Sequence, residues 1–276
     1  MKTILGTTLT LLVAYALLIR LTPKTDRVFL QSQWQRNRHV IEHYIQSGKD
    51  YDFVFAGSSL TQNIDFDPSA TNVYNLALAG DSALTSLGAI HASPHHPRKV
   101  FVEINFPERE LRDSVIRSVS GILPSLSDIF LVRNIPANFV LTQLNRLRKG
   151  PSGEEYNESV FNRMLAREVA KSAEPLDAKL LDQRMRQFRD LIGDLEKRGT
   201  TVVLYEMPVH PKVAESVRAQ QVRAAFKSLL PDHALIDGRT LMRGREVHTK
   251  DGLHLRSQEM EALRPGLRAL YGSPGA

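Results

Sequence analysis

The sequence predicts an α/β fold of three layers, in which helices cover both faces of a parallel sheet, preceded by one N-terminal transmembrane helix. Three observations lead to this prediction. Short apolar runs alternate with helical patterns through most of the chain, which is typical of a parallel sheet. The first twenty residues are almost free of charge. The 276 residues, 42% hydrophobic and 24% charged, have a composition that favours a globular protein and excludes a disordered one.

The N-terminal helix is predicted from residues 3–19, which carry no charged side chain and lie between basic residues. This length is at the short limit of about 17–25 residues that cross a bilayer. Ala14-Tyr15-Ala16 also fits a signal-peptidase site, but the apolar run continues beyond it to Ile19. The pattern therefore favours an uncleaved single-pass anchor over residues 1–20, with a cleaved signal or a peripheral helix as alternatives.

The connection between the anchor and the domain is predicted as a helical, juxtamembrane connector over residues 21–46 that lifts the domain off the membrane. Basic residues are more frequent after the apolar run, at Arg20, Lys24 and Arg27, than before it. Taken alone, this bias places the body of the protein in the cytoplasm by the positive-inside rule.

The domain itself is predicted over residues 47–276. Apolar runs bounded by turn residues indicate four strands, and a strong helical period indicates a long amphipathic helix before the fourth. Parallel sheets bind ligands at the carboxyl ends of their strands, and the sequence indicates a helical insertion near that edge at about residues 107–175. The expected strands are Asp52–Ala56, Val73–Leu78, Lys99–Ile104 and Thr201–Glu206, and the expected helix is Asp177–Arg198.

Charge and cysteine content limit the functional classes. The formal charge is +6, but the basic residues are scattered among acidic ones and do not cluster with aromatic residues, so we expect no nucleic-acid partner. The chain has no cysteine, which excludes disulfides and thiolate catalysis and is compatible with an oxidising compartment.

Two distant motifs indicate serine chemistry. The first predicted strand runs into Gly57-Ser58-Ser59, and Asp251-Gly252-Leu253-His254 follows near the C-terminus. A nucleophilic serine needs an imidazole to accept its proton and a carboxylate to orient that imidazole. We therefore predict Ser59 as nucleophile, His254 as base and Asp251 as its orienting residue.

With these motifs, the chain resembles the SGNH (GDSL-like) hydrolases, which have a flavodoxin-like sheet. Further matching residues are Gly80, after the second predicted strand, and Asn105, after the third. The resemblance implies an oxyanion hole made by the backbone N–H groups of Ser59 and Gly80 and the side chain of Asn105. Two departures from the family pattern occur. Glu103-Ile104-Asn105-Phe106-Pro107 stands in place of Gly-x-Asn-Asp, and Ser58 stands in place of the aspartate.

Each motif has an alternative interpretation. Ser59 can be a helix cap only, and Ser82, in Gly80-Asp81-Ser82, is a rival serine. Glu206 and His210 follow the fourth predicted strand and are candidates for substrate contact, although a structural role is the simpler interpretation. His39-Val40-Ile41-Glu42-His43 matches a zinc-peptidase pattern, but it lies before the first strand. We therefore predict no metal and no cofactor.

The Gly-Ser-Ser form is similar to that of the membrane-anchored relatives that handle acyl groups on cell-envelope polymers, such as the alginate O-acetylation proteins. The resemblance implies a serine esterase or O-acyltransferase with an acyl-serine intermediate, and a catalytic domain on the periplasmic or extracytoplasmic side. It also implies an acylated glycan or small acyl ester as substrate and a membrane-bound acyltransferase as a candidate partner. The alternative from another class is an inactive, glycan-binding scaffold protein of an envelope polysaccharide assembly.

Overall fold

The computed structural model describes residues 2–22, 28–64, 66–67, 69–120, 131–146 and 157–272. Its five strands form one sheet in the order β2-β1-β3-β4-β5, and every neighbouring pair is parallel. This is the strand order of flavodoxin-like folds, and it confirms the predicted fold class. The strands are β1 (Phe53–Ala56), β2 (Val73–Asn75), β3 (Lys99–Glu103), β4 (Thr201–Tyr205) and β5 (Leu235–Ile236).

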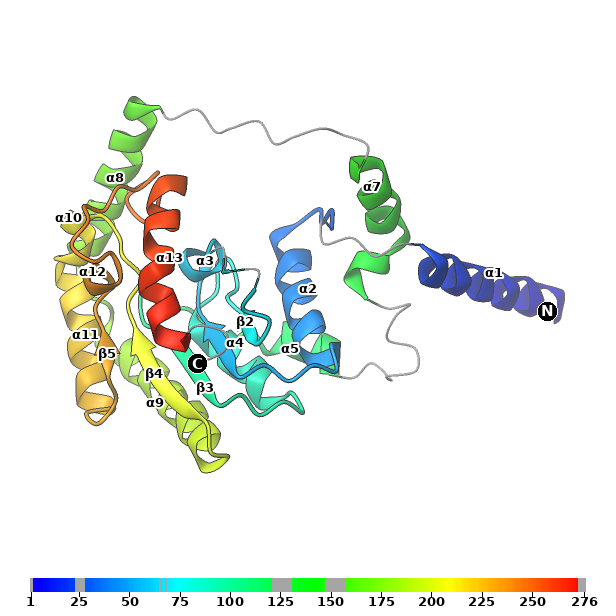
Figure 1. Cartoon of the computed structure of the whole chain (residues 1–276), viewed down its shortest axis with the longest axis horizontal. Helices are drawn as coiled ribbons and strands as arrows, with labels where there is room; N and C mark the ends of the chain where they lie inside the picture. Colours follow the sequence, from blue (N-terminus) through cyan, green and yellow to red (C-terminus); the bar gives the residue numbers. More distant parts are fainter. Residues whose placement is uncertain are drawn as a thin grey trace.

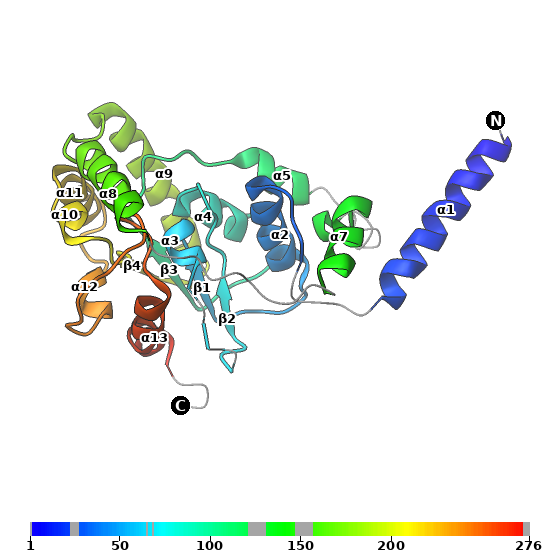
Figure 2. The same ribbon diagram turned by 90° about the horizontal axis from the view of Figure 1, so that it is seen from above.

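Each face of the sheet buries its own core because side chains alternate along each strand. Val54 and Val102 point into one core, and Phe55 and Phe101 point into the other. Figure 2 shows α4 and α9 on one side of the strands and α12 and α13 on the other. The helices of the first core are α2 (Gln33–Gln46), α4 (Ala83–His91), α5 (Asp113–Ser120), α9 (Ala178–Lys197) and α11 (Val217–Leu229). Those of the second are α3 (Ser59–Gln62), α10 (Pro211–Ala214), α12 (Gly238–Leu241) and α13 (Ser257–Tyr271).

Strands β1 to β4 agree with the four predicted runs except at their ends, and β5 was not predicted. The second predicted strand ends early, at Asn75, although the N–H groups of Leu76 and Leu78 still donate to β1 and its turn, at Phe55 O and Gly57 O, both over 2.9 Å. Residues 76–78 therefore still run beside the first strand. The long helix before β4 spans Ala178–Lys197 and is capped by Asp177.

The expected connector over residues 21–46 differs in the structure. Among the described residues it is helical at Leu21 and in α2, and Ile41 and Tyr44 of α2 are fully buried in the first core. Helix α2 is therefore part of the domain and not a spacer. Lys24 and Arg27 lie outside the described residues.

The segment predicted as a helical insertion, at about residues 107–175, contains helices wherever the structure describes it. They are α5, the short 3₁₀ helix η2 (Val132–Asn134), α7 (Pro136–Arg146) and α8 (Glu158–Ser172). The turn-forming residues Pro124, Gly150, Pro151 and Gly153 of this segment lie outside the described residues.

The N-terminal helix α1 (Lys2–Leu21) extends away from the domain, with α7 lying between it and α2 (Figure 1). Its segment Thr3–Leu21 is long and apolar enough to cross a membrane, and no residue of that segment is fully buried, although Tyr15 is partly covered by the rest of the protein. A signal sequence has the same properties.

Candidate active site

The predicted nucleophile lies on the sharp turn between β1 and α3. Ser58 caps α3, because its Oγ accepts a hydrogen bond from the Leu60 N–H, and Ser59 is the first residue of the helix. Gly57 is required here by space, since a Cβ atom would come within 2.5 Å of the Glu103 carboxylate and 2.7 Å of Thr61 Oγ1. Helix α3 is a single turn, so its macrodipole is small, and the turn acts mainly by orienting Ser59.

The structure brings Ser59, His254 and Asp251 together in one hydrogen-bonded line. Ser59 Oγ lies 2.9 Å from His254 Nε2, and His254 Nδ1 lies 2.7 Å from Asp251 Oδ2. An ionised carboxylate can only accept, so Nδ1 carries the proton and Nε2 is left with its lone pair toward the serine hydroxyl. This is the tautomer that a general base needs.

The loop that carries Asp251 and His254 is fixed by its own backbone. Asp251 Oδ1 accepts the N–H groups of Leu253 and His254 over 2.9 and 2.8 Å. Gly252 lies in the left-handed region, with φ +95°, and its carbonyl accepts the His210 N–H over 3.1 Å. The loop is thus tied to the end of β4, which holds the imidazole above the carboxyl edge of the sheet.

The environment of Asp251 keeps it ionised. Burial by itself would raise the pKa of this carboxyl, but the hydrogen bonds from the His254 side chain and from the backbone N–H groups of His254 and Leu253 outweigh burial and lower it. A permanently charged carboxylate stabilises the imidazolium that forms when His254 takes the serine proton.

Glu103, which the sequence analysis left without a role, lies buried beneath the nucleophile turn. It is 3% exposed, and its carboxylate accepts hydrogen bonds from Ser58 N–H (2.8 Å), Ser58 Oγ (2.6 Å) and Thr61 Oγ1 (2.6 Å). Thr61 Oγ1 also bonds to the buried Tyr205 hydroxyl. Burial, together with the Glu103 charge, raises the pKa of Tyr205 far above its usual range. These contacts tie β1, α3, β3 and β4 together under Ser59.

The two rival serines have structural roles. Ser58 is 1% exposed, and its hydroxyl is occupied by Glu103 and Leu60. Ser82 is 2% exposed; it caps α4 by accepting from the Leu84 N–H and donates to Arg109 O. Of the three candidates, only Ser59 is partly accessible and hydrogen-bonded to a histidine.

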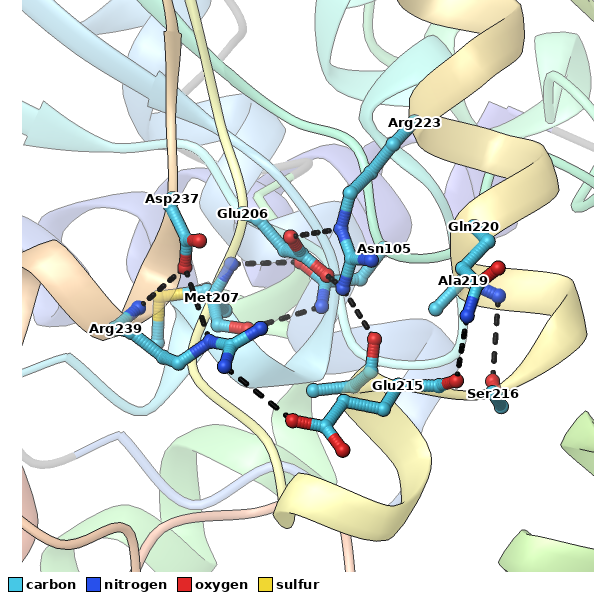
Figure 3. A network of polar contacts seen from close by, with 11 residues as sticks. Asn105, Glu206, Met207, Glu215, Ser216, Ala219, Gln220, Arg223, Asp237 and Arg239 are labelled. Atoms are coloured by element: carbon cyan, nitrogen blue, oxygen red, sulfur yellow. Dashed lines mark hydrogen bonds and ion pairs between the residues drawn. The ribbon is translucent and has the colours of Figure 1, made fainter.

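The two predicted oxyanion residues beside Ser59 lie at the same edge of the sheet. Gly80 has φ +74°, a conformation that favours glycine, and stands two residues after Leu78, whose N–H donates to Gly57 O. Asn105 pairs with the backbone of Met207, donating to its carbonyl over 3.1 Å and accepting its N–H over 2.8 Å (Figure 3). One of the two amide hydrogens of Asn105 is thus used by Met207, and a role in the oxyanion hole rests on the other.

Glu206 and His210 make contacts that fit a structural role, which is the simpler of the two interpretations of these residues. Glu206 is 7% exposed and forms a two-pronged ion pair with Arg223 of α11, at 2.8 and 3.1 Å (Figure 3). The His210 side chain caps α10 by accepting from the Lys212 N–H. Burial, followed by the charge of Lys212, lowers the pKa of His210. Substrate contact by these two side chains stays a prediction.

A pocket opens next to the site between the ends of β3 and β4 and helices α8, α10 and α11. Asn105 and Leu253, the residue before His254, belong to its lining. Its lining is partly apolar, and its charged residues are Glu108, Glu168, Lys171, Glu206 and Arg218. Helix α8 of the insertion thus forms one wall of this pocket.

Side chains of the zinc-peptidase pattern on α2 make other contacts. Glu42 is fully buried and bonds to Arg38 and to the Val132 N–H, while the His43 ring stacks on Tyr74 at 5.6 Å. Within the part of the chain that the structure describes, no group of three histidine or acidic side chains is arranged to hold a metal ion.

Comparisons with known proteins do not identify the function. No protein-family model and no curated protein matches the chain. One solved structure that matches is from Streptococcus pneumonia and is provisionally described as a platelet activating factor. It has 13% sequence identity and a TM-score of 0.46, and the match covers 97% of this chain and 99% of that one. The geometry of the site therefore carries the functional inference.

Proposed function

We propose that the protein is a membrane-anchored serine enzyme of the SGNH type that cleaves an acyl ester through an acyl-serine intermediate. The observation that supports this most strongly is the continuous line from Ser59 Oγ to His254 Nε2 and from His254 Nδ1 to Asp251 Oδ2, at 2.9 and 2.7 Å. A scaffold protein has no need of this alignment, whereas nucleophilic catalysis requires it.

In the first half of the proposed reaction, Ser59 Oγ bonds to the carbonyl carbon of the ester as its proton passes to His254 Nε2. The resulting oxyanion is stabilised by the N–H groups of Ser59 and Gly80 and by the remaining amide hydrogen of Asn105. The tetrahedral intermediate then expels the alcohol, which takes the proton from His254, and leaves the acyl group on Ser59.

In the second half, His254 accepts a proton from the incoming hydroxyl, which attacks the acyl-serine, and then returns it to Ser59 Oγ. With water as acceptor the protein is an esterase, and with a sugar hydroxyl it is an O-acyltransferase. We infer an acylated cell-envelope glycan or related ester as substrate, with its remainder in the pocket beside Asn105 and Leu253. The domain then acts on the extracytoplasmic side, alone or with a membrane-bound acyltransferase.

Replacing Asp251 by asparagine is expected to lower ester turnover by up to about 10⁴-fold, the loss typical of a triad carboxylate. The amide oxygen can keep the bonds to the Leu253 and His254 N–H groups, but the amide nitrogen then faces His254 Nδ1. This favours the opposite tautomer, with the proton on Nε2, which cannot accept the Ser59 proton. Hydrolysis of a small acetyl ester by the wild type and by Asp251→Asn measures the loss.

The pH dependence of stability provides a control for this variant. Because the pKa of Asp251 is lowered in the folded state, its stabilising contribution is present above its unfolded pKa and is lost as the pH falls through the folded pKa. The difference in free energy of unfolding between wild type and Asp251→Asn should therefore shrink in acid. Equal turnover of the two proteins near neutral pH would contradict the role of Asp251. Absence of both ester hydrolysis and acetyl transfer to a glycan, in every variant including the wild type, would favour the scaffold.

A further inference from the structure

Helix α7 turns its polar side toward the protein and its apolar side toward the outside. Asn138 is fully buried and donates to Val132 O over 2.8 Å, and Thr142 is 5% exposed and accepts the Phe29 N–H over 2.9 Å. On the outward side, Val140 and Leu144 are 53% and 55% exposed. Helices on the surface of a soluble domain have the opposite orientation, so the outer face of α7 favours an apolar environment.

This orientation of α7 is fixed by the segment that precedes it. The Val132 N–H of η2 donates over 2.8 Å to Glu42, a fully buried carboxylate on α2 that also pairs with Arg38 at 2.7 Å. Asn138 in turn binds the Val132 carbonyl. The apolar face therefore cannot rotate inward without breaking the buried hydrogen bond from Asn138 to Val132 O, which Glu42 holds in place.

Helix α7 also contacts the membrane-spanning candidate α1. The Tyr15 hydroxyl donates to Asn134 O over 2.6 Å, and its ring meets the edge of Phe139 at 6.1 Å. Tyr15 lies six residues before Leu21, the last residue of α1, or about 9 Å along a helix with a rise of about 1.5 Å per residue. If α1 crosses a bilayer, α7 lies at about the 5–10 Å depth at which amphipathic helices rest in the interface.

The stretch of sequence that contains α7 is basic. Between residues 131 and 149 the sequence contains Arg133, Arg146, Arg148 and Lys149 and no acidic residue. Basic segments next to a membrane are attracted to anionic headgroups. An outward apolar face in a basic stretch of sequence is typical of an interfacial helix.

The geometry points to α7 as an interfacial helix that docks the domain onto the same anionic bilayer that α1 crosses, with Val140 and Leu144 among the acyl chains. The domain is then held on the membrane by two elements and is not suspended from a spacer. This inference depends on insertion of α1 and is independent of the proposed chemistry at Ser59.

Tryptophan fluorescence tests the inference because the chain has one tryptophan, Trp34. In a Trp34→Phe background, Leu144→Trp places the reporter on α7, and Leu11→Trp places it on α1. Val217→Trp is the matched control, since Val217 is 52% exposed on the distant helix α11. Each full-length protein is reconstituted into phosphatidylglycerol and phosphatidylcholine vesicles, with the phosphatidylcholine brominated on its acyl chains or unlabelled.

Bromine quenches only a tryptophan that reaches the acyl region, so the Leu144→Trp and Leu11→Trp proteins should lose roughly half of their fluorescence and Val217→Trp almost none. Quenching at position 11 without quenching at position 144 would overturn the docking of α7. That result would leave a membrane protein partner as the occupant of its apolar face. Quenching at neither position would overturn both the docking and the insertion of α1. The substituted side chains are exposed, so circular dichroism should show an unchanged fold.

Discussion

Replacing His254 by alanine is expected to lower turnover of an acetyl ester by about 10⁴–10⁶-fold, or roughly 5–8 kcal/mol of transition-state stabilisation. The reason is that His254 Nε2, 2.9 Å away, is the histidine nitrogen in contact with Ser59 Oγ. Without it, the hydroxyl has no base and the leaving alcohol has no acid. The kcat should fall much more than the KM changes, because the imidazole acts on the reacting atoms.

Two further variants make this prediction specific. Ser59→Ala combined with His254→Ala should be no slower than either single variant, because residues of a triad act as a unit. His96→Ala is the matched control, since His96 is exposed before β3, at the opposite edge of the sheet, and its loss should leave turnover unchanged. Residual turnover above a tenth of the wild-type value in His254→Ala would show that another group removes the serine proton.

Glu103→Ala is expected to lower the free energy of unfolding by about 3–5 kcal/mol, because it removes the acceptor of three buried donors, of which the Thr61 hydroxyl keeps a contact with Tyr205. These are the Ser58 N–H, the Ser58 hydroxyl and the Thr61 hydroxyl, all within 2.8 Å of the carboxylate. Chemical denaturation of the wild type and variant measures the change. Glu110→Ala, at an exposed glutamate in the loop after β3, should change stability by less than about 0.5 kcal/mol.

Glu103→Gln separates positioning from stability. The amide keeps one acceptor oxygen but presents an N–H₂ group to a donor from Ser58 or Thr61, so the turn that carries Ser59 must shift. Since a displacement of about 1 Å can cost about 10²-fold in rate, we expect a lower kcat with little change in KM in a protein that still folds. A fully active, equally stable Glu103→Gln protein would contradict a positioning role for Glu103.

Local sequence pattern was sufficient for most of the fold. The strands β1, β3 and β4 are mainly apolar runs that are largely buried, and the helix Ala178–Lys197 has a regular apolar face. The strand β5 has only two residues, Leu235–Ile236, and such a short run has no periodic signal. The order of the strands depends on pairing between distant segments, which the hydrophobic periodicity does not reveal. It was expected only from the resemblance to the SGNH hydrolases, which have a flavodoxin-like sheet.

Some residues of the candidate site could likewise be predicted from local motifs, and others could not. Ser59, Asp251 and His254 were predicted because the two motifs have short fixed spacings, and folding brings them together across 195 residues of sequence. The Glu103 network and the pairing of Asn105 with Met207 join positions 45 and 102 residues apart, with no spacing to reveal them. The one local sign of the role of Glu103 was its position as an acidic residue at the end of an apolar strand.

Mass spectrometry of the protein treated with a fluorophosphonate tests the central claim most directly, because the reagent forms a stable adduct only with an activated serine. The triad predicts one adduct per chain, mapped to the peptide that contains Ser59, absent in Ser59→Ala and retained in Ser82→Ala. An adduct that persists in Ser59→Ala, or a wild-type protein that shows esterase activity but never labels at Ser59, would contradict it.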